Sequence, residues 1–308
     1  MDKEKMNGHI AIFTANIIFG INTPISRSLI PEILSPFSLT FFRLFGSALL
    51  FWIASLFFKR EVVPAKDIFL IFLASLFALS FNQLPFFIGL SMTSPIDASI
   101  VITMLPILTM ILAAVFIKEP ITLIKALGVL VGASGALLLI FSSEHIHKGQ
   151  SNFWGNIIVF GAVASFAVYL AAFKAVVSRY SAVTVMKWMF LFASIVCFPF
   201  CKDAVFSVQY SELSSSVLWR IAYVVVLSTF VTYLLIPIAQ RVLRPTTFSM
   251  YNYLQPIMAS LVAVMVGLDT FGVEQALAGI LVFVGVYLVT QSKSRLQLEA
   301  EQIQKKPK

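Results

Sequence analysis

Ten runs of apolar residues, each close to twenty residues long, dominate this sequence. A helix needs about 20 such residues to cross the ~30 Å hydrocarbon core of a bilayer, where its backbone polar groups must be satisfied internally. The pattern therefore predicts an all-α membrane protein with ten transmembrane helices. The runs cover residues 9–29, 36–58, 67–90, 95–117, 123–141, 153–175, 182–200, 217–240, 245–267 and 272–291.

Composition argues against the main soluble alternatives. The chain is 59% hydrophobic and 12% charged, whereas soluble domains carry about 25% charged residues. Its net charge of +8 does not indicate nucleic-acid binding, because the basic residues lie in short connectors and the C-terminal tail. The short connectors leave no room for a soluble catalytic domain, and the chain has no HExxH or GxSxG motif. We therefore expect no enzymatic activity, no cofactor and no metal site.

The distribution of basic residues predicts how the chain is oriented. Lys and Arg concentrate in the cytoplasmic connectors of helical membrane proteins. With the N-terminus inside, few basic residues fall in external connectors, namely Arg27, Lys148, Lys202 and Arg220. We therefore expect a multi-pass protein of the cell (inner) membrane with both termini cytoplasmic.

An internal repeat appears when the sequence is shifted by 150 residues. Landmarks then coincide in order: Pro95 with Pro245, Ser99 with Ser249, Pro106 with Pro256, Glu119 with Asp269, and Gly135 with Gly285. Five spans per half is an odd number, so the second half must enter the membrane inverted, as in many transporters. We predict one repeat over residues 1–148, an inverted repeat over 149–291, and a basic cytoplasmic tail over 292–308.

Three stretches carry a resemblance to a known family. Residues 94–140 have a proline midway along a span, an acid at its end and then a glycine-spaced span. Residues 244–289 look like a second copy, and SPFSLTFFR at 35–43 is similar to the family's second span. The chain thus resembles the EamA family of the drug/metabolite transporter superfamily. That resemblance implies two repeats around a central cavity lined by spans one, three, four, six, eight and nine.

The resemblance and the repeat together favour a transporter of small metabolites. We expect an exporter of amino acids or related metabolites that works by alternating access as a monomer, since one chain holds both halves. A carrier of hydrophobic drugs or lipids is the main alternative, and a passive channel is a weaker one. A coupling proton stays open as a partner, although no acid falls convincingly in midspan.

Span nine carries the clearest candidate site for a solute. Ser249, Asn252 and Gln255 recur every three residues and so lie along one helix face. Their uncharged amides and hydroxyl can donate and accept hydrogen bonds, which suits a polar or zwitterionic solute. Hydrogen bonding between helices for packing is the alternative.

Further polar residues in the spans are candidates because such groups are costly in a membrane unless they are paired or face water. Asn82 and Gln83 lie in span three, and Tyr233 in span eight occupies the repeat position of Gln83. Asn16 and Asn22 lie in span one. All five are predicted to contact solute, with local satisfaction of the helix backbone as the alternative.

Prolines and one arginine are candidates for hinges and gates. A proline removes a backbone hydrogen bond and bends a helix. Arg43 is the cation that looks most buried; it serves either as a gate or partner of a substrate carboxylate, or as a structural residue reaching a carbonyl or the interface. The predicted hinge and gate residues are Pro24, Pro85, Pro106, Pro256 and Arg43.

Overall fold

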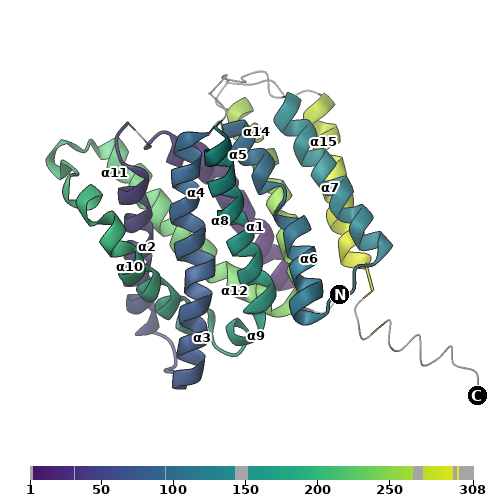
Figure 1. Ribbon diagram of the computed structural model, residues 1–308, viewed down its shortest axis with the longest axis horizontal. Coiled ribbons are helices and arrows are strands. Elements are labelled where there is room, and N and C mark those ends of the chain that lie inside the picture. Colours follow the sequence, from purple (N-terminus) through teal and green to yellow (C-terminus); the bar gives the residue numbers. More distant parts are fainter. Residues whose placement is uncertain are drawn as a thin grey trace, which may run out of the picture.

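A computed structural model describes residues 3–30, 32–93, 95–142, 152–265, 273–293 and 297. Within these ranges the chain is helical and has no strand (Figure 1). Seven described helical stretches are long and apolar enough to cross a membrane: Lys3–Ser26, Pro36–Ser55, Ala65–Met92, Ile100–Ile117, Phe153–Ala172, Ala182–Phe206 and Ser215–Val242. Two shorter apolar helices, Leu123–Leu138 and Ala276–Gln291, lie in the predicted fifth and tenth spans.

The first half follows the predicted spans closely. Its third span contains a π-helix, in which each turn holds one extra residue. The elements are α1 (Lys3–Arg27), α2 (Pro36–Ser55), α3 (Ala65–Ser75), the π-helix η1 (Leu76–Ser80), α4 (Phe81–Met92), α5 (Pro95–Ile102), α6 (Leu105–Ile117) and α7 (Leu123–Ser142).

The second half repeats this order. Its elements are α8 (Phe153–Ala172), α9 (Lys174–Val177), α10 (Ala182–Phe206), the 3₁₀ turn η2 (Tyr210–Glu212), α11 (Ser215–Ala222), the π-helix η3 (Tyr223–Val231), α12 (Thr232–Val242), α13 (Pro245–Met250), the 3₁₀ turn η4 (Tyr251–Tyr253), α14 (Leu254–Met265) and α15 (Val273–Gln291). The two π-helices lie in corresponding spans, three and eight.

Spans four and nine are interrupted where the sequence predicts only bends. A proline ring clashes with the carbonyl four residues earlier. For Pro106 that residue is Ile102, the last residue of α5, and for Pro256 it is Asn252, inside η4. Both prolines therefore lie in the first turn of a new helix segment.

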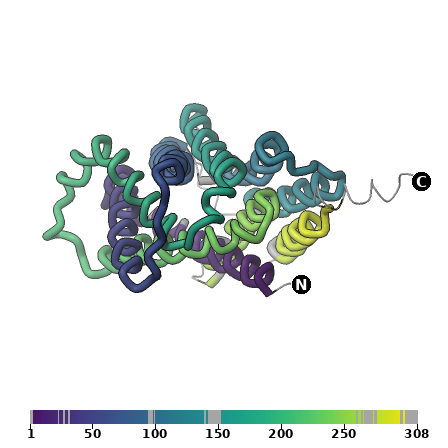
Figure 2. Tube along the Cα trace, turned by 90° about the horizontal axis from the view of Figure 1, so that it is seen from below, coloured from purple at the N-terminus to yellow at the C-terminus, as the bar shows by residue number. Residues whose placement is uncertain are grey.

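The packing of the helices has the pattern of two related halves. Figures 1 and 2 show an elongated bundle with α2 and α10 at one end and α7 and α15 at the other. In each pair the two helices contact each other and occupy equivalent positions in the two halves: α2 and α10 are spans two and seven, and α7 and α15 are spans five and ten. The contact of α4 with α8 corresponds likewise to that of α12 with α1. An axis of approximate two-fold symmetry therefore passes through the middle of the bundle.

Glycine allows α7 and α15 to approach closely. A Cβ atom on Gly285 would lie 2.6 Å from the carbonyl oxygen of Gly128 and 2.7 Å from the Cα of Gly132, which is closer than van der Waals contact allows. Small residues of this kind are the usual device for packing helices in a membrane.

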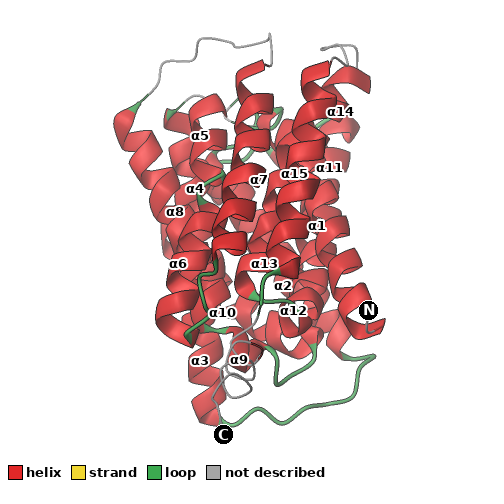
Figure 3. Ribbon diagram, turned by 90° about the vertical axis from the view of Figure 1, so that its right-hand side faces the viewer, coloured by secondary structure: helices red, strands yellow, loops and turns green. Residues whose placement is uncertain are grey.

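The outer surface is apolar, as a lipid environment requires. Large side chains that point away from the bundle include Phe200, which is 68% exposed, and Trp219, which is 77% exposed. The start of α1 and the end of α15 lie on the same, lower side of the bundle (Figures 1 and 3), as an even number of crossings requires.

Candidate functional site

Three amides connect spans one and nine inside the bundle. The Nε2 atom of Gln255 donates to Oδ1 of Asn16 at 2.9 Å and to Oδ1 of Asn252 at 2.9 Å. Asn16 is 1% exposed, whereas Asn252 and Gln255 are half-buried. We call these three residues the amide network. It joins α1 of the first half to η4 and α14 of the second.

The 3₁₀ turn η4 sets the geometry of the amide network. Because a 3₁₀ helix has three residues per turn, residues three apart lie directly in line. Asn252 therefore points along the same side as Gln255, and its Nδ2 donates to the carbonyl of Ser249 at 3.0 Å. The hydroxyl of Ser249 bonds locally to the carbonyl of Thr246, so Ser249 contributes its backbone rather than its side chain.

A second contact lies on the axis between the halves. Nε2 of Gln83 donates to the hydroxyl of Tyr233 at 3.1 Å. These residues are 150 positions apart, which is the repeat offset, and residues related by a two-fold axis can touch only near that axis. Both are buried, Gln83 at 4% and Tyr233 at 4% exposed.

Aromatic rings surround this axial pair. Phe19 and Phe190 pack edge-on against Tyr233, with ring centroids 6.3 and 5.1 Å away. Tyr169 is close enough to Tyr233 to interact electrostatically, and its buried hydroxyl has no hydrogen-bond partner. Sequence reasoning missed Tyr169. The signal that could have found it is its place in span six, which the family resemblance assigns to the lining of the cavity.

Arg43 inserts beside the axial pair from α2. Its Nε donates to Oγ1 of Thr229 at 3.0 Å, and its guanidinium lies 5.2 Å from the centre of the Phe87 ring. Thr229 is one turn before Tyr233, and Phe87 is one turn after Gln83. Arg43 thus lies against both helices that carry the pair.

The contacts of Arg43 can be weighed against the cost of its position. An arginine at the centre of a membrane helix costs about 2.5–3.5 kcal/mol on insertion scales. A desolvated cation–π contact offsets about 2 kcal/mol, and a charged hydrogen bond about 1.5–3 kcal/mol. The two contacts are therefore sufficient to hold Arg43 in place while using one of its five N–H donors.

Lys125 is even more enclosed than Arg43, at 1% exposure, but it has an acidic partner. Its Nζ lies 2.8 Å from Oε1 of Glu119 and also donates to the carbonyl of Pro120. Arg43, at 5% exposure, has no acidic partner among the described residues, whereas the charge of Lys125 is paired. Glu119, the acid at the end of span four, has a structural role in the turn to α7.

Two of the predicted amides lie apart from these contacts. The Oδ1 of Asn22 accepts a hydrogen bond from Ser26 on the same helix, at 3.1 Å. Asn82 donates to the carbonyl of Ala162 at 2.9 Å and so joins α4 to α8. Among the prolines, Pro24 is exposed and Pro85 lies inside α4, in the second turn after the π-helix.

The hollows recorded in the structure lie away from the axis. A groove of about 530 Å³ lies between η1, α6 and α8 and is lined by apolar side chains such as Phe81, Ile111 and Phe160, together with Ser165. A second, of about 240 Å³, lies between α1, α14 and α15 beside His9 and Tyr251. Gln83 and Tyr233 are buried at the axis in this conformation, and the central cavity stays a prediction.

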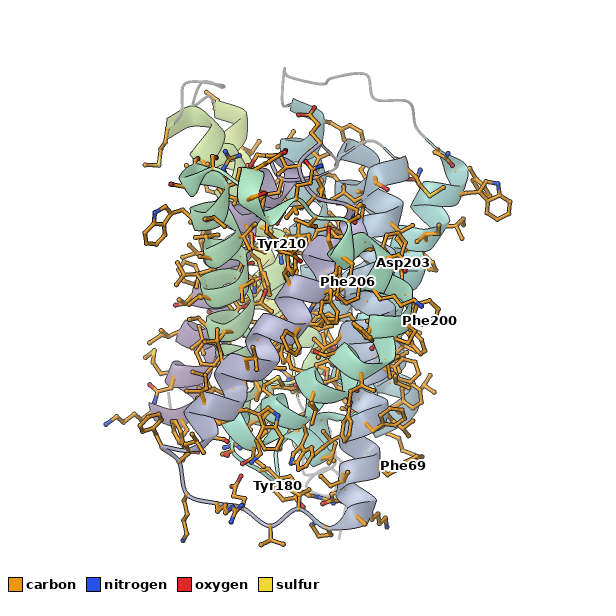
Figure 4. All side chains as sticks on the ribbon, turned by 90° about the vertical axis from the view of Figure 1, so that its left-hand side faces the viewer. Phe69, Tyr180, Phe200, Asp203, Phe206 and Tyr210 are labelled. Atoms are coloured by element: carbon orange, nitrogen blue, oxygen red, sulfur yellow. The ribbon has the colours of Figure 1, made fainter. Side chains whose placement is uncertain are left out.

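A polar clasp joins the two halves at one end of the bundle. The hydroxyl of Tyr180 donates to Asp67 at 2.5 Å, and Nη1 of Arg179 lies 3.0 Å from the same carboxylate. The backbone N–H and hydroxyl of Ser181 donate to Glu61 at 2.9 and 2.8 Å. Figure 4 shows Tyr180 near the lower end of the bundle and Tyr210 toward the upper end.

These contacts shift the pKa values of two groups in the connectors. The hydrogen bond to Asp67 raises the pKa of Tyr180 above its ordinary value. Burial acts to raise the pKa of Glu61, but hydrogen bonds from Thr184 and Ser181 outweigh it and hold that pKa below 4.5. Glu61 is therefore ionised at neutral pH, where it accepts hydrogen bonds at the start of α10.

The fold is that of a multi-pass helical membrane protein with an internal repeat, and its polar groups gather between the halves. Comparison with known proteins gives the family. The profile of the EamA-like transporter family matches residues 6–141 and again 153–291. The chain belongs to this family, and the resemblance drawn from the sequence is confirmed.

Individual relatives are distant but consistent. The chain is 27% identical to an uncharacterized transporter of Archaeoglobus fulgidus over 65% of this chain and 69% of that protein. It is 24% identical to the uncharacterized transporter YyaM of Bacillus subtilis, over 74% of each. A WAT1-related protein of Arabidopsis thaliana is 21% identical, over 96% of this chain and 87% of that one.

A solved crystal structure shares the fold. Its TM-score is 0.74, and the match covers 93% of this chain and 98% of the other at 16% sequence identity. At that identity the likeness concerns the fold alone. Together with the family, it identifies this chain as a membrane transporter.

Proposed function

We propose that the protein carries small polar metabolites across the cell (inner) membrane, with amino acids and related compounds as the class to test first. The observation that carries this proposal is the amide network. Asn16, Asn252 and Gln255 place neutral donors and acceptors inside a membrane bundle, where polar groups are costly unless they serve packing or a solute. They also lie between the two halves.

The proposed mechanism is alternating access by rocking of the halves. The axial pair, Gln83 and Tyr233, is the point about which two related halves would turn. The polar clasp closes one end of the interface in this conformation. We propose that this end is cytoplasmic, that both termini lie there, and that a single chain is the working unit with export as its net direction.

We propose His9 as the group that carries a coupling proton. Histidine is the side chain whose charge changes most readily near neutral pH. The Nδ1 atom of His9 lies 2.6 Å from the hydroxyl of Tyr251, directly beside Asn252, and Lys5 is the charged group that acts on it. His9→Gln should then abolish the response of transport to an imposed proton gradient while solute exchange continues.

The test of the function is uptake by purified protein in proteoliposomes. A panel of radiolabelled amino acids and related metabolites is compared with and without an imposed proton gradient. Saturable uptake of one class supports the proposal and names the substrate. Uptake equal to that of protein-free liposomes for every compound on the panel contradicts it.

A carrier of lipophilic compounds is the second candidate. The apolar groove between η1, α6 and α8 favours it, since about 530 Å³ can hold a drug-sized molecule. Lipid chains also fill such grooves on membrane proteins, so the groove weighs less than the amide network. Competition of a hydrophobic cation with amino-acid uptake would separate the two candidates.

A further inference from the structure

Arg43 lacks an acidic partner. It is 5% exposed, and its terminal nitrogens hydrogen-bond to none of the residues that the structure describes. The ion pairs recorded there are Lys125 with Glu119 and Arg179 with Asp67. Four N–H donors of a buried guanidinium are therefore unused, beside the axis on which the two halves meet.

Complementary groups at the axial pair, which Arg43 adjoins, are also unused. The Oε1 atom of Gln83 is sealed from water without a hydrogen-bond partner, although its Nε2 is bonded to Tyr233. The hydroxyl of Tyr169 is likewise buried without a hydrogen-bond partner. Buried polar groups are satisfied in the great majority of cases, so unsatisfied ones that cluster need an explanation. Here they offer a cation, an acceptor, and a hydroxyl that can donate or accept.

We infer that Arg43 binds the carboxylate of the transported solute, which makes the substrate class small organic monocarboxylates that include amino acids. A guanidinium fork matches a carboxylate with two parallel hydrogen bonds. The acceptor Oε1 of Gln83 suits the ammonium group of the same solute. This inference rests on the proposed transport function and specifies its substrate.

The single positive charge of Arg43 determines which class of anionic group the site can bind. In the second half, residues 188–201 of α10 contain no lysine or arginine, so the middle of that span supplies no matching cation. One cation neutralises one negative charge, and a phosphate dianion would keep an unpaired charge in a medium of low dielectric constant. A monoanion therefore fits this site better than a phosphate ester.

The enclosure of these groups implies that the solute enters when the halves separate. Gln83 and Tyr169 are 4% and 1% exposed in this conformation. The hydrogen bond between Gln83 and Tyr233 joins α4 to α12 at the axis, and rocking of the halves would open this contact to one side. The unused donors and acceptors would then face the opening.

The experiment compares amino acids with their carboxamides, which keep the ammonium group but lack the carboxylate. Purified protein in lipid nanodiscs is titrated with L-leucine, L-phenylalanine and L-threonine, and with the carboxamide of each, while thermal unfolding is followed. We expect at least one acid to bind 10-fold or more tightly than its amide. Arg43→Gln should reduce this preference by about 10- to 100-fold, the value of one charged hydrogen-bonded contact.

Two further variants keep the result interpretable. Arg43→Lys retains the charge beside Phe87 but not the planar fork, and it should keep part of the preference even if R43Q unfolds. Arg220→Gln is the matched control, since the guanidinium of Arg220 on α11 bonds to Ser28 and Ser216 at the surface. It should bind acids as the parent does.

The inference is overturned if the parent binds amides as tightly as acids, if no acid on the panel binds, or if R43Q or R43K keeps the full preference. Saturable uptake into proteoliposomes of a solute that has no carboxylate would then support the transport function without a carboxylate site. A purely structural Arg43 would lower binding of acid and amide alike, so the ratio between them separates the two roles.

Discussion

At the scale of single residues, the amides of spans one and nine offer a direct test of the transport site. Replacing Asn252 or Gln255 by alanine removes a hydrogen bond of the amide network. We expect each change to lower transport by 10-fold or more, with a modest loss of stability of about 1 kcal/mol. Initial uptake rates and thermal unfolding of the same preparations would be compared.

Asn156→Ala is the matched control for these variants. Asn156 on α8 accepts a hydrogen bond from Thr93 at 2.6 Å outside the amide network, so its loss should reduce stability and leave the rate per folded molecule unchanged. Parental transport by folded N252A and Q255A would contradict the site.

Replacing Tyr169 should change stability and transport in opposite directions. Its hydroxyl is buried and unpaired, and such a group costs about 1–3 kcal/mol. Tyr169→Phe should therefore keep or raise the unfolding temperature while transport falls. A lower unfolding temperature with normal transport would show that the hydroxyl is already satisfied and has no part in transport.

At the scale of elements, the turn from α6 to α7 holds a strained residue. Lys118 has a φ of 54°, in the left-handed region that costs a side-chain residue about 1–2 kcal/mol. Glycine would remove this cost but would add about 0.5–1 kcal/mol of entropy to the unfolded chain. Lys118→Gly should therefore raise the free energy of unfolding by up to about 1 kcal/mol.

Lys118→Val provides the contrast at the same position. A β-branched residue fits the left-handed region worse than lysine does, so this variant should be less stable than the parent. Unfolding temperatures of the two variants on opposite sides of the parent would support the strain. The reverse order would mean that the turn adopts another conformation.

At the scale of the whole molecule, the polar clasp predicts a dependence on pH. Because the pKa of Glu61 is lowered in the folded state, its stabilising contribution is present above the ordinary value of 4.5 and is lost as the pH falls through the folded pKa. Glu61→Gln should therefore be less stable than the parent at pH 7, and the difference should shrink below about pH 4.5. A difference that does not change with pH would exclude the clasp as the cause.

The orientation of the molecule predicts the sides of two connectors. Val62 lies between α2 and α3 and is 91% exposed, and Glu212 is exposed in η2 after α10. Single cysteines would be placed there after Cys197 and Cys201, both buried, are replaced by alanine. An impermeant thiol reagent should label the Glu212→Cys variant from outside intact cells and the Val62→Cys variant only after lysis. Labelling of the Val62→Cys variant from outside would reverse the proposed topology.

The sequence determined the class of the protein, because lengths of apolar runs follow directly from bilayer thickness. The offset of 150 likewise determined that Gln83 and Tyr233 correspond, and the prolines determined where spans four and nine change direction. Each of these properties depends on the order of residues along one helix or on a comparison of two segments.

Only the tertiary structure decided which polar groups meet. Asn82 and Gln83 are neighbours in the chain, yet one faces α8 and the other faces Tyr233, because successive residues of a helix point about 100° apart. The sequence placed Arg43 in a membrane span, but its lack of an acidic partner depends on what α4 and η3 bring beside it. The partners of a buried charge are a property of packed helices, and no single span contains them.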